Sequence, residues 1–377
     1  MEMSFSNVLI AVVIFSAIIL FHELGHFLLA KANKVGVIEF SLGMGPRIIT
    51  FAKTDAGCRV KLFGTNKYFE EHPEYENHTC YSWKILPFGG SCMMLGEMES
   101  LQDSRAFGNK GVLARISVIA AGPIFNFILA FVLALCVIGV VGYDKAEITS
   151  VETGMPLAES GFQDGDIITG INGRNIVLNR ELTSYLQFHP LSDAPVELTA
   201  DRGGQEVKAM VTPRLVTNDD GKEVYRLGFA YGNGRTKTGV WDTIKYSAYE
   251  VKFWIWTTVE SLGKIISGKV SAKEVAGPVG IIQAVGDVVD QSRRGGIEFI
   301  WLNVINFSIL ITANLGVMNL LPIPALDGGR LLFLIIEAIR RKPLPEKFEN
   351  YVNLGGFVLL MGLMVVILAN DILKLIP

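Results

Sequence analysis

The sequence predicts a polytopic α-helical membrane protein with four transmembrane helices, to which one small α+β domain is added. Half of the 377 residues are apolar and only 19% are charged, against about 25% in an average soluble protein. The mean hydropathy is +0.38. The apolar residues gather in four runs, at residues 5–30, 116–142, 299–321 and 352–369. Each run is close to or above the roughly 20 residues that cross a bilayer as a helix.

Basic residues predict how these runs are oriented. Lys31 and Lys34 follow the first run, and Lys110 and Arg115 precede the second. If every run crosses the membrane once, all basic clusters lie on one side, which is the cytoplasmic side by the positive-inside rule. Both chain termini and the region 143–298 are then extracytoplasmic. The third basic cluster lies between the last two runs and comprises Arg330, Arg340, Arg341, Lys342 and Lys347.

Residues 143–213 are expected to form the small α+β domain. An Asp-Gly pair at 164–165 and an Asn-Gly pair at 172–173 flank an apolar run at 167–171, a pattern typical of a hairpin-like strand. Further strands are expected at 196–200 and 207–211, and a helix at 179–188. This order of turns and strands resembles a PDZ domain of the bacterial protease-associated kind. Such a domain binds a peptide as an added strand or captures a C-terminal carboxylate.

The region between this domain and the third run is expected to contain amphipathic or interfacial helices and a linker. From Trp241 to Gly268 the pattern is helical and rich in aromatic residues, which suits a helix at the bilayer interface or one packed against the small domain. The chain therefore divides into an N-terminal membrane part (1–142), the small domain (143–213), this linking region (214–298) and a C-terminal membrane part (299–377).

The most informative pattern is the His-Glu-x-x-His sequence at 22–26, inside the first apolar run. On a helix, His22 and His26 lie on one face and can bind one metal ion, while Glu23 can reach a water molecule beside it. Unpaired ionisable groups in a membrane span cost at least a few kcal/mol each, so an accidental match is improbable here. The pattern predicts a Zn²⁺ site with Glu23 as the catalytic base.

Two histidines require a third protein ligand if one position of a tetrahedral zinc is kept for water. Asp327 is the candidate, because Pro322 and Pro324 break the third helix just before it. Irregular backbone at membrane depth is tolerated only where it lines protein or a water-filled cavity. The alternative is that Asp327 only caps a helix that begins at Gly328.

His72 and His78 are rival ligands, and Cys58 and Cys80 are near enough in sequence to suggest a second metal site. The polar stretch 66–79 that holds both histidines is more typical of a charged cytoplasmic loop.

A membrane-associated β-hairpin is expected at 37–51, where apolar and polar residues alternate on both sides of a Gly-Met-Gly-Pro turn. Its edge, or the glycine-rich loop 88–94 with Gly89 and Gly90, would hold an unwound substrate as an added strand. The alternative is a hairpin that only plugs the cavity.

Seven motifs occur in order along essentially the whole chain: His22-Glu23-x-x-His26, Gly43-Met44-Gly45-Pro46, Pro87-Phe88-Gly89-Gly90, Gly96-Glu97, Gly122-Pro123-x-x-Asn126-Phe127, Gly277-Pro278-x-Gly280 and Asn319-x-x-Pro322-x-Pro324-x-x-Asp327-Gly328. Together they resemble the site-2 protease family of intramembrane zinc metalloproteases (peptidase M50-like), in its bacterial regulator-of-sigma-E protease branch. The resemblance implies that His22, His26 and Asp327 bind zinc, that Glu23 is the base, and that Asn319 contacts peptide-like ligands beside the active site. The chain departs from the family in having room for only one PDZ domain and in the stretch 66–79, which looks inserted.

The resemblance also implies a function: hydrolysis of peptide bonds in or near the transmembrane segments of single-span membrane proteins, such as anti-sigma factors or remnant signal peptides. The expected location is the bacterial cytoplasmic membrane. The alternatives are a catalytically silent scaffold that binds partners through the PDZ domain, and a transporter with a midplane cation site. A net charge of −3 disfavours a nucleic-acid partner, so the expected partners are the lipid bilayer and membrane proteins.

Overall fold

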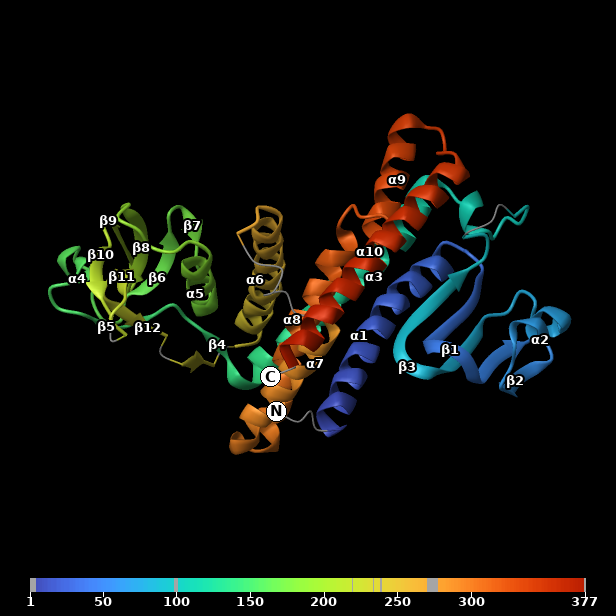
Figure 1. Cartoon of the computed structure of the whole chain (residues 1–377), viewed down its shortest axis with the longest axis horizontal. Coiled ribbons are helices and arrows are strands. Elements are labelled where there is room, and N and C mark those ends of the chain that lie inside the picture. Colours follow the sequence, from blue (N-terminus) through green and yellow to red (C-terminus); the bar gives the residue numbers. More distant parts are fainter. Residues whose placement is uncertain are drawn as a thin grey trace. The chain divides into compact units, whose positions relative to one another are not determined.

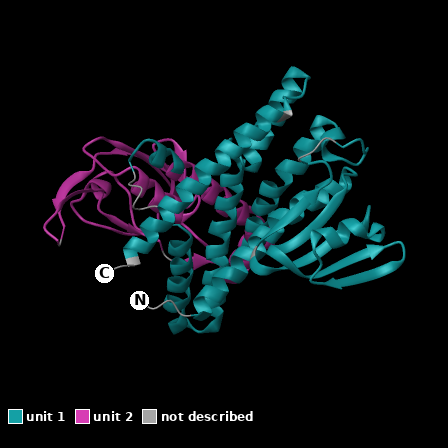
Figure 2. Ribbon diagram, turned by 45° about the vertical axis from the view of Figure 1, so that its right-hand side comes forward, with its two compact units in different colours: residues 1–133, 262–377 teal, residues 134–261 magenta. Residues whose placement is uncertain are grey.

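The computed structural model describes residues 5–97, 101–218, 220–232, 234–237, 239–269 and 277–375. The chain forms two compact units (Figure 2), of which one comprises residues 1–133 and 262–377 and the other residues 134–261. Within the described ranges, four helices are long and apolar enough to cross a membrane, as the apolar runs predict. They are α1 (Phe5–Ala32), α3 (Val112–Val141), α8 (Ile297–Leu320) and α10 (Glu346–Leu375).

Two shorter helices precede and follow α8 in the sequence of the first unit. Helix α7 (Pro278–Ser292) contacts α1, α8 and α10, and the 3₁₀ turn η4 (Arg293–Gly295) leads from it into α8. Helix α9 (Asp327–Arg340) follows α8 after the proline-containing turn. Helices α1 and α3 approach closely, because a Cβ atom at Gly25 would overlap the carbonyl oxygen of Ala121. A small residue is therefore required where these two helices meet.

An antiparallel sheet with the order β2-β1-β3 lies beside α1 (Figure 1). Its strands are β1 (Val37–Thr54), β2 (Gly57–Leu62) and β3 (Cys80–Met94). Residues 80–83 of β3 pair with both halves of β1, at 39–42 and at 49–52, whereas 90–94 pair with 37–42 alone. The expected simple hairpin at 37–51 is therefore wrong. Strand β1 bends at Gly43 and Gly45, whose φ angles are +86° and +89°, and β3 inserts between the two halves.

The stretch 66–79 covers part of this sheet. It forms α2 (Asn66–Glu71) and the 3₁₀ turn η1 (Pro73–Tyr75). The aromatic side chains of this stretch form a small apolar cluster with the buried Ala52 and Cys80. Its members are Tyr68, Phe69 and Tyr75.

Glu39 is a carboxylate buried inside the sheet, with 1% of its surface exposed. It accepts hydrogen bonds from Arg47 Nε at 2.5 Å and Ser82 Oγ at 2.5 Å, and Lys84 Nζ lies 2.9 Å from its second oxygen. Burial alone would raise the pKa of Glu39, but the hydrogen bonds from Arg47, Ser82 and Lys84 more than offset it and hold the pKa below its usual value. The stabilisation is therefore present at neutral pH and is lost as the pH falls below the ordinary glutamate pKa of about 4.3.

Replacing Glu39 with glutamine is expected to destabilise the sheet by about 3–5 kcal/mol, because Arg47 and Lys84, whose side chains are only 14% exposed, lose a buried counter-charge. Amide hydrogen exchange of residues 80–84 in the detergent-purified protein should accelerate. Glu71→Gln is the control, since Glu71 is 61% exposed in its ion pair with Lys67 and such pairs contribute little. Equal exchange in wild type and Glu39→Gln would show that the buried charges are not coupled to folding.

The second unit contains a four-stranded antiparallel sheet in the order β7-β6-β8-β9. The expected strands at 167–171, 196–200 and 207–211 and the helix at 179–188 are confirmed. The elements are α4 (Pro156–Glu159), β6 (Ile167–Ile171), β7 (Arg174–Asn175), α5 (Asn179–Phe188), β8 (Val196–Arg202) and β9 (Gln205–Val211). Their apolar side chains form one buried core that includes Ile148, Leu157, Ile168, Leu182 and Leu198.

Three strand pairs extend this unit. Strands β5 (Ile148–Val151) and β12 (Phe229–Tyr231) pair, as do β4 (Tyr143–Asp144) and β13 (Arg235–Thr236). The third pair is β10 (Arg214–Thr217) with β11 (Glu223–Arg226). Strands beyond residue 213, where the sequence places the end of the domain, thus pair with strands at its beginning.

Helix α6 (Val240–Ile266) is the aromatic-rich segment. Phe253, Trp254 and Trp256 belong to a cluster that contains Leu178 and Tyr143. The Arg174 guanidinium lies 3.4 Å from the centre of the Trp256 ring. Of the two arrangements that the sequence left open, the structure shows the helix packed against the small domain.

Candidate active site

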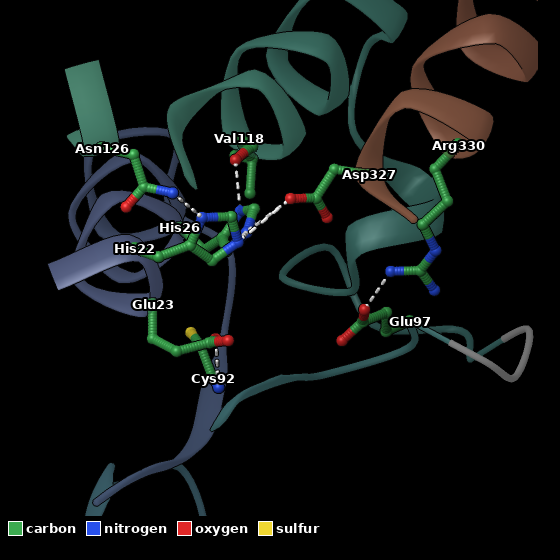
Figure 3. Close-up of polar contacts among 9 residues, drawn as sticks. All are labelled: His22, Glu23, His26, Cys92, Glu97, Val118, Asn126, Asp327 and Arg330. Atoms are coloured by element: carbon green, nitrogen blue, oxygen red, sulfur yellow. Dashed lines mark hydrogen bonds and ion pairs between the residues drawn. The ribbon is translucent and has the colours of Figure 1, made fainter. Parts of the chain in front are cut away.

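His22, His26 and Asp327 converge on one point (Figure 3). The two histidines are one turn apart on α1 and are both buried, with 6% of their surface exposed. Asp327 is the first residue of α9, and Leu326 occupies the N-cap position that the alternative assigned to Asp327. Asp327 Oδ2 lies 3.1 Å from His22 Nε2 and 3.3 Å from His26 Nε2, and the two Nε2 atoms are 3.2 Å apart.

These three atoms have the spacing of metal ligands. A tetrahedral Zn²⁺ with bonds of about 2.0–2.1 Å separates its ligand atoms by about 3.3–3.4 Å, close to the 3.1–3.3 Å edges of this triangle. Asp327 Oδ2 is also buried without a hydrogen-bond partner. A cation would satisfy that oxygen, so the residues present fit Zn²⁺ with its fourth position left for water.

The Nδ1 atoms of both imidazoles, which do not face Asp327, also have hydrogen-bonding partners. His26 Nδ1 lies 2.9 Å from the carbonyl oxygen of Val118 on α3. A carbonyl can only accept, so His26 Nδ1 carries a proton, and the neutral form of the ring then presents a lone pair at Nε2. His22 Nδ1 lies 3.1 Å from the side-chain amide of Asn126, also on α3.

Helix α3 fits against the histidines because residue 122 has no side chain. A Cβ atom at Gly122 would overlap His26 Nε2 and lie 2.7 Å from His22 Cε1. Gly122 and Asn126 belong to the Gly122-Pro123-x-x-Asn126-Phe127 motif, but the motif alone does not predict their contacts with the histidines. Their spacing of four residues, which puts them on one face of a helix, is the feature of the sequence that points to these contacts.

Gly122→Ala is expected to remove most of the zinc affinity while the protein stays folded, because the added methyl group displaces both imidazoles. The bound metal would be measured on purified protein by atomic emission. Gly362→Ala on α10 is a matched control in a membrane-spanning helix, since a Cβ atom there meets nothing within 4 Å. Full zinc content in Gly122→Ala would contradict this close packing.

Glu23 is held by the edge of the sheet. Its Oε2 accepts a hydrogen bond from the backbone N–H of Cys92 at 2.9 Å. A Cβ atom at Gly90 would lie 3.3 Å from Glu23 Cγ and 3.0 Å from the Ser41 carbonyl oxygen, so any side chain there would have to displace these neighbours. Gly89 has a φ of +78°, a conformation that favours glycine.

Glu97 connects this edge of the sheet to the helix that carries Asp327. One oxygen of Glu97 forms an ion pair with Arg330, and the other accepts from the backbone N–H of Met94 at 3.3 Å. Glu97 and Arg330 line a cavity of about 520 Å³ whose walls also include the ion pair of Arg115 with Glu337. The 3₁₀ turn η2 (Phe107–Asn109) borders the same cavity. The sequence contained Glu97 in a motif without suggesting this link.

The other predicted residues are not members of this group of three ligands. Asn319 is half-buried in the last turn of α8. His72 stacks on Tyr68 with ring centres 3.8 Å apart, and His78 Nε2 lies 3.5 Å from Asp55 Oδ2. Within the described ranges, His22, His26 and Asp327 form the only group of three with metal-ligand spacing. The rival site is therefore not assembled there.

Comparison of this chain with known proteins shows the family to which it belongs. The model of peptidase family M50 matches residues 10–65 and 56–363. The chain is 34% identical to a protein of Clostridium acetobutylicum named as a zinc metalloprotease, over 98% of each chain. It is 32% identical to the zinc metalloprotease RasP of Bacillus licheniformis and 30% identical to the regulator of sigma-W protease RasP of Bacillus subtilis, in both cases over 98% of this chain and 99% of the relative.

The chain belongs to peptidase family M50. The resemblance to the site-2 proteases is thus confirmed, and the protein is a membrane metalloendopeptidase. Two solved PDZ domains also match part of this peptidase. That of the SdrC-like protein from Listeria monocytogenes is 21% identical, with a TM-score of 0.20, and covers 24% of this chain and 88% of its own. Its counterpart from Listeria innocua is 19% identical with the same TM-score, covering 25% and 99%.

Proposed function

We propose that this M50 peptidase uses Zn²⁺ to hydrolyse peptide bonds in or near the transmembrane segments of single-span membrane proteins. One observation carries the proposal: His22 and His26, on a helix long and apolar enough to cross a membrane, meet Asp327 within 3.3 Å. Two imidazoles and a carboxylate with one open position are the ligand set of hydrolytic zinc sites. Bound zinc would polarise the scissile carbonyl as a Lewis acid and would lower the pKa of water, so that the water can lose a proton and attack near neutral pH.

Glu23 is the catalytic base in this proposal. Its carboxylate takes a proton from the attacking water and returns it to the leaving nitrogen. The Cys92 N–H donates a hydrogen bond to Oε2 and so orients the carboxylate. Oε1 is then the oxygen that exchanges the proton with water. This division of roles explains why a catalytic side chain is bound to the edge of a sheet.

The substrate must be unwound before attack, because a helix engages its carbonyl groups in internal hydrogen bonds. Residues 90–94 pair with β1 on one side only, and their other edge adjoins Glu23 through Cys92 and Gly90. We infer that the unwound substrate adds to this edge as a strand. Gly89 and Gly90 keep the edge free of side chains, and Asn319 would bind the substrate backbone.

The basic residues next to the four spans support a location in the bacterial cytoplasmic membrane, with both termini and the PDZ domain outside. The extreme terminal residues, 1–4 and 376–377, lie outside the described ranges. By family resemblance, the substrates would be anti-sigma factors or remnant signal peptides. The PDZ domain would bind a peptide strand or a free C-terminal carboxylate.

The proposal is tested with the full-length protein in liposomes that contain a model single-span substrate. Cleavage should stop when a chelator removes zinc and should return when Zn²⁺ is added back. Mass spectrometry should place the cut bond within or beside the transmembrane segment. Zinc binding without any cleavage would favour the scaffold, and cleavage that persists in metal-free protein would refute the zinc mechanism.

A further inference from the structure

Asn126 is a buried amide on α3 whose side chain contacts His22. Its side-chain nitrogen lies 3.1 Å from His22 Nδ1, and none of its surface is exposed. Its side-chain oxygen is buried without a hydrogen-bond partner. The residue is held in place by its backbone, because Thr312 Oγ1 on α8 donates to the Asn126 carbonyl oxygen at 3.2 Å.

The side of the amide that faces His22 decides which ring nitrogen carries the proton. If the NH₂ group faces Nδ1, then Nδ1 accepts and Nε2 bears the hydrogen. That hydrogen can be donated to Asp327 Oδ2, 3.1 Å away. If the amide oxygen faces Nδ1, then Nδ1 bears the hydrogen and Nε2 presents its lone pair to the point shared with His26 and Asp327.

Only the second arrangement is compatible with a metal ion. His26 already presents a lone pair at Nε2, because its Nδ1 donates to the Val118 carbonyl. With the Asn126 oxygen towards His22, three lone pairs converge within 3.3 Å of one another, and a cation is needed to offset their repulsion. Rotation of the amide by 180° exchanges the two arrangements with almost no change in shape.

We propose that Asn126 is a positioning residue that sets the tautomer of His22: its amide oxygen accepts the Nδ1 hydrogen when the metal is bound, and its NH₂ group donates to Nδ1 when the metal is absent. This inference rests on the proposed zinc function. An amide suits the task because it can donate or accept at one place, so the same residue satisfies the buried imidazole in both states. Groups that orient a metal-bound histidine in this way typically change metal affinity by about 10–100-fold when removed.

The test measures the zinc dissociation constant of the purified full-length protein by competition with a chromophoric chelator. Asn126→Leu keeps the volume but cannot accept, so the dissociation constant should rise about 10–100-fold. Asn126→Asp can only accept, which favours the Nδ1–H tautomer, and should bind zinc at least as tightly as wild type. Ser308→Ala removes a hydrogen bond within α8, from Ser308 Oγ to the Val304 carbonyl oxygen, and is the matched control, with unchanged affinity expected.

If Asn126 had a purely structural role, Asn126→Leu and Asn126→Asp would bind zinc equally weakly, and that result would overturn the proposal. Wild-type affinity in Asn126→Leu would also overturn it, while leaving the zinc function intact provided that His22→Ala loses zinc. Failure of the wild type itself to bind zinc would overturn both. If Asn126→Leu does not fold, the zinc dissociation constant of Asn126→Asp still tests the proposal. A value at or below that of the wild type supports it, and a value at least about tenfold higher would overturn it.

Discussion

Replacing Glu23 with glutamine is expected to lower the rate of peptide-bond hydrolysis by about 10²–10⁴-fold, the usual contribution of a positioned proton-transfer group. Glutamine can still accept the hydrogen bond that the Cys92 N–H donates to Glu23, so the side chain should keep its position. It cannot take a proton from water at neutral pH. The zinc content should remain that of the wild type, because Glu23 is not among the three ligand residues.

The measurement combines cleavage of a single-span substrate in liposomes with metal analysis of the same preparation. Glu71→Gln, the exposed glutamate used above as a control, should cleave like the wild type. Lost cleavage with retained zinc separates a missing base from a missing metal. Unchanged cleavage by Glu23→Gln would remove Glu23 from the mechanism.

Asp327→Ala is expected to weaken zinc binding by more than about 100-fold, because residues that only hydrogen-bond to a metal ligand already contribute about 10–100-fold. Alanine leaves two imidazoles from one helix and no carboxylate to neutralise the ion. Hydrolysis should fall with zinc occupancy and should recover in part at high Zn²⁺ concentration. Both quantities can be followed in one titration of the purified protein.

The control for Asp327→Ala is Asp55→Ala, which removes the carboxylate 3.5 Å from His78. It should leave zinc binding unchanged. Full zinc occupancy in Asp327→Ala, together with loss of zinc in Asp55→Ala, would show that the metal binds near His72 and His78 instead. That pair of results would contradict the proposed active site.

Local patterns in the sequence were sufficient for the membrane-spanning helices and for most elements of the small domain. Long apolar runs and paired turn residues are properties of neighbouring positions, so they can be recognised without knowledge of the fold. The pair His22 and His26 belongs to the same class, because four residues along a helix place both rings on one face.

The sheet shows where local patterns fail. The alternation at 37–51 indicates extended chain but does not say which strand pairs with it. Strand β3 supplies the partners, from 30 residues away for Phe51 and Tyr81 to 57 residues away for Val37 and Met94. The buried cluster around Glu39 depends on that pairing, because Lys84 and Ser82 come from β3. The sequence around a single acidic residue in a strand does not reveal which residues of another strand will pair with it.

The sequence by itself determined that two imidazoles and a glutamate lie on one apolar helix, and it suggested Asp327 as their partner. Only the tertiary structure decided that Asp327 comes within 3.1 Å of His22, that Gly122 makes room for the rings, and that Asn126 faces His22 Nδ1. The physical reason is that distances between residues on different helices depend on how closely those helices pack. Such packing is set by side-chain volumes on both sides of the interface, which the pattern of one helix alone does not specify.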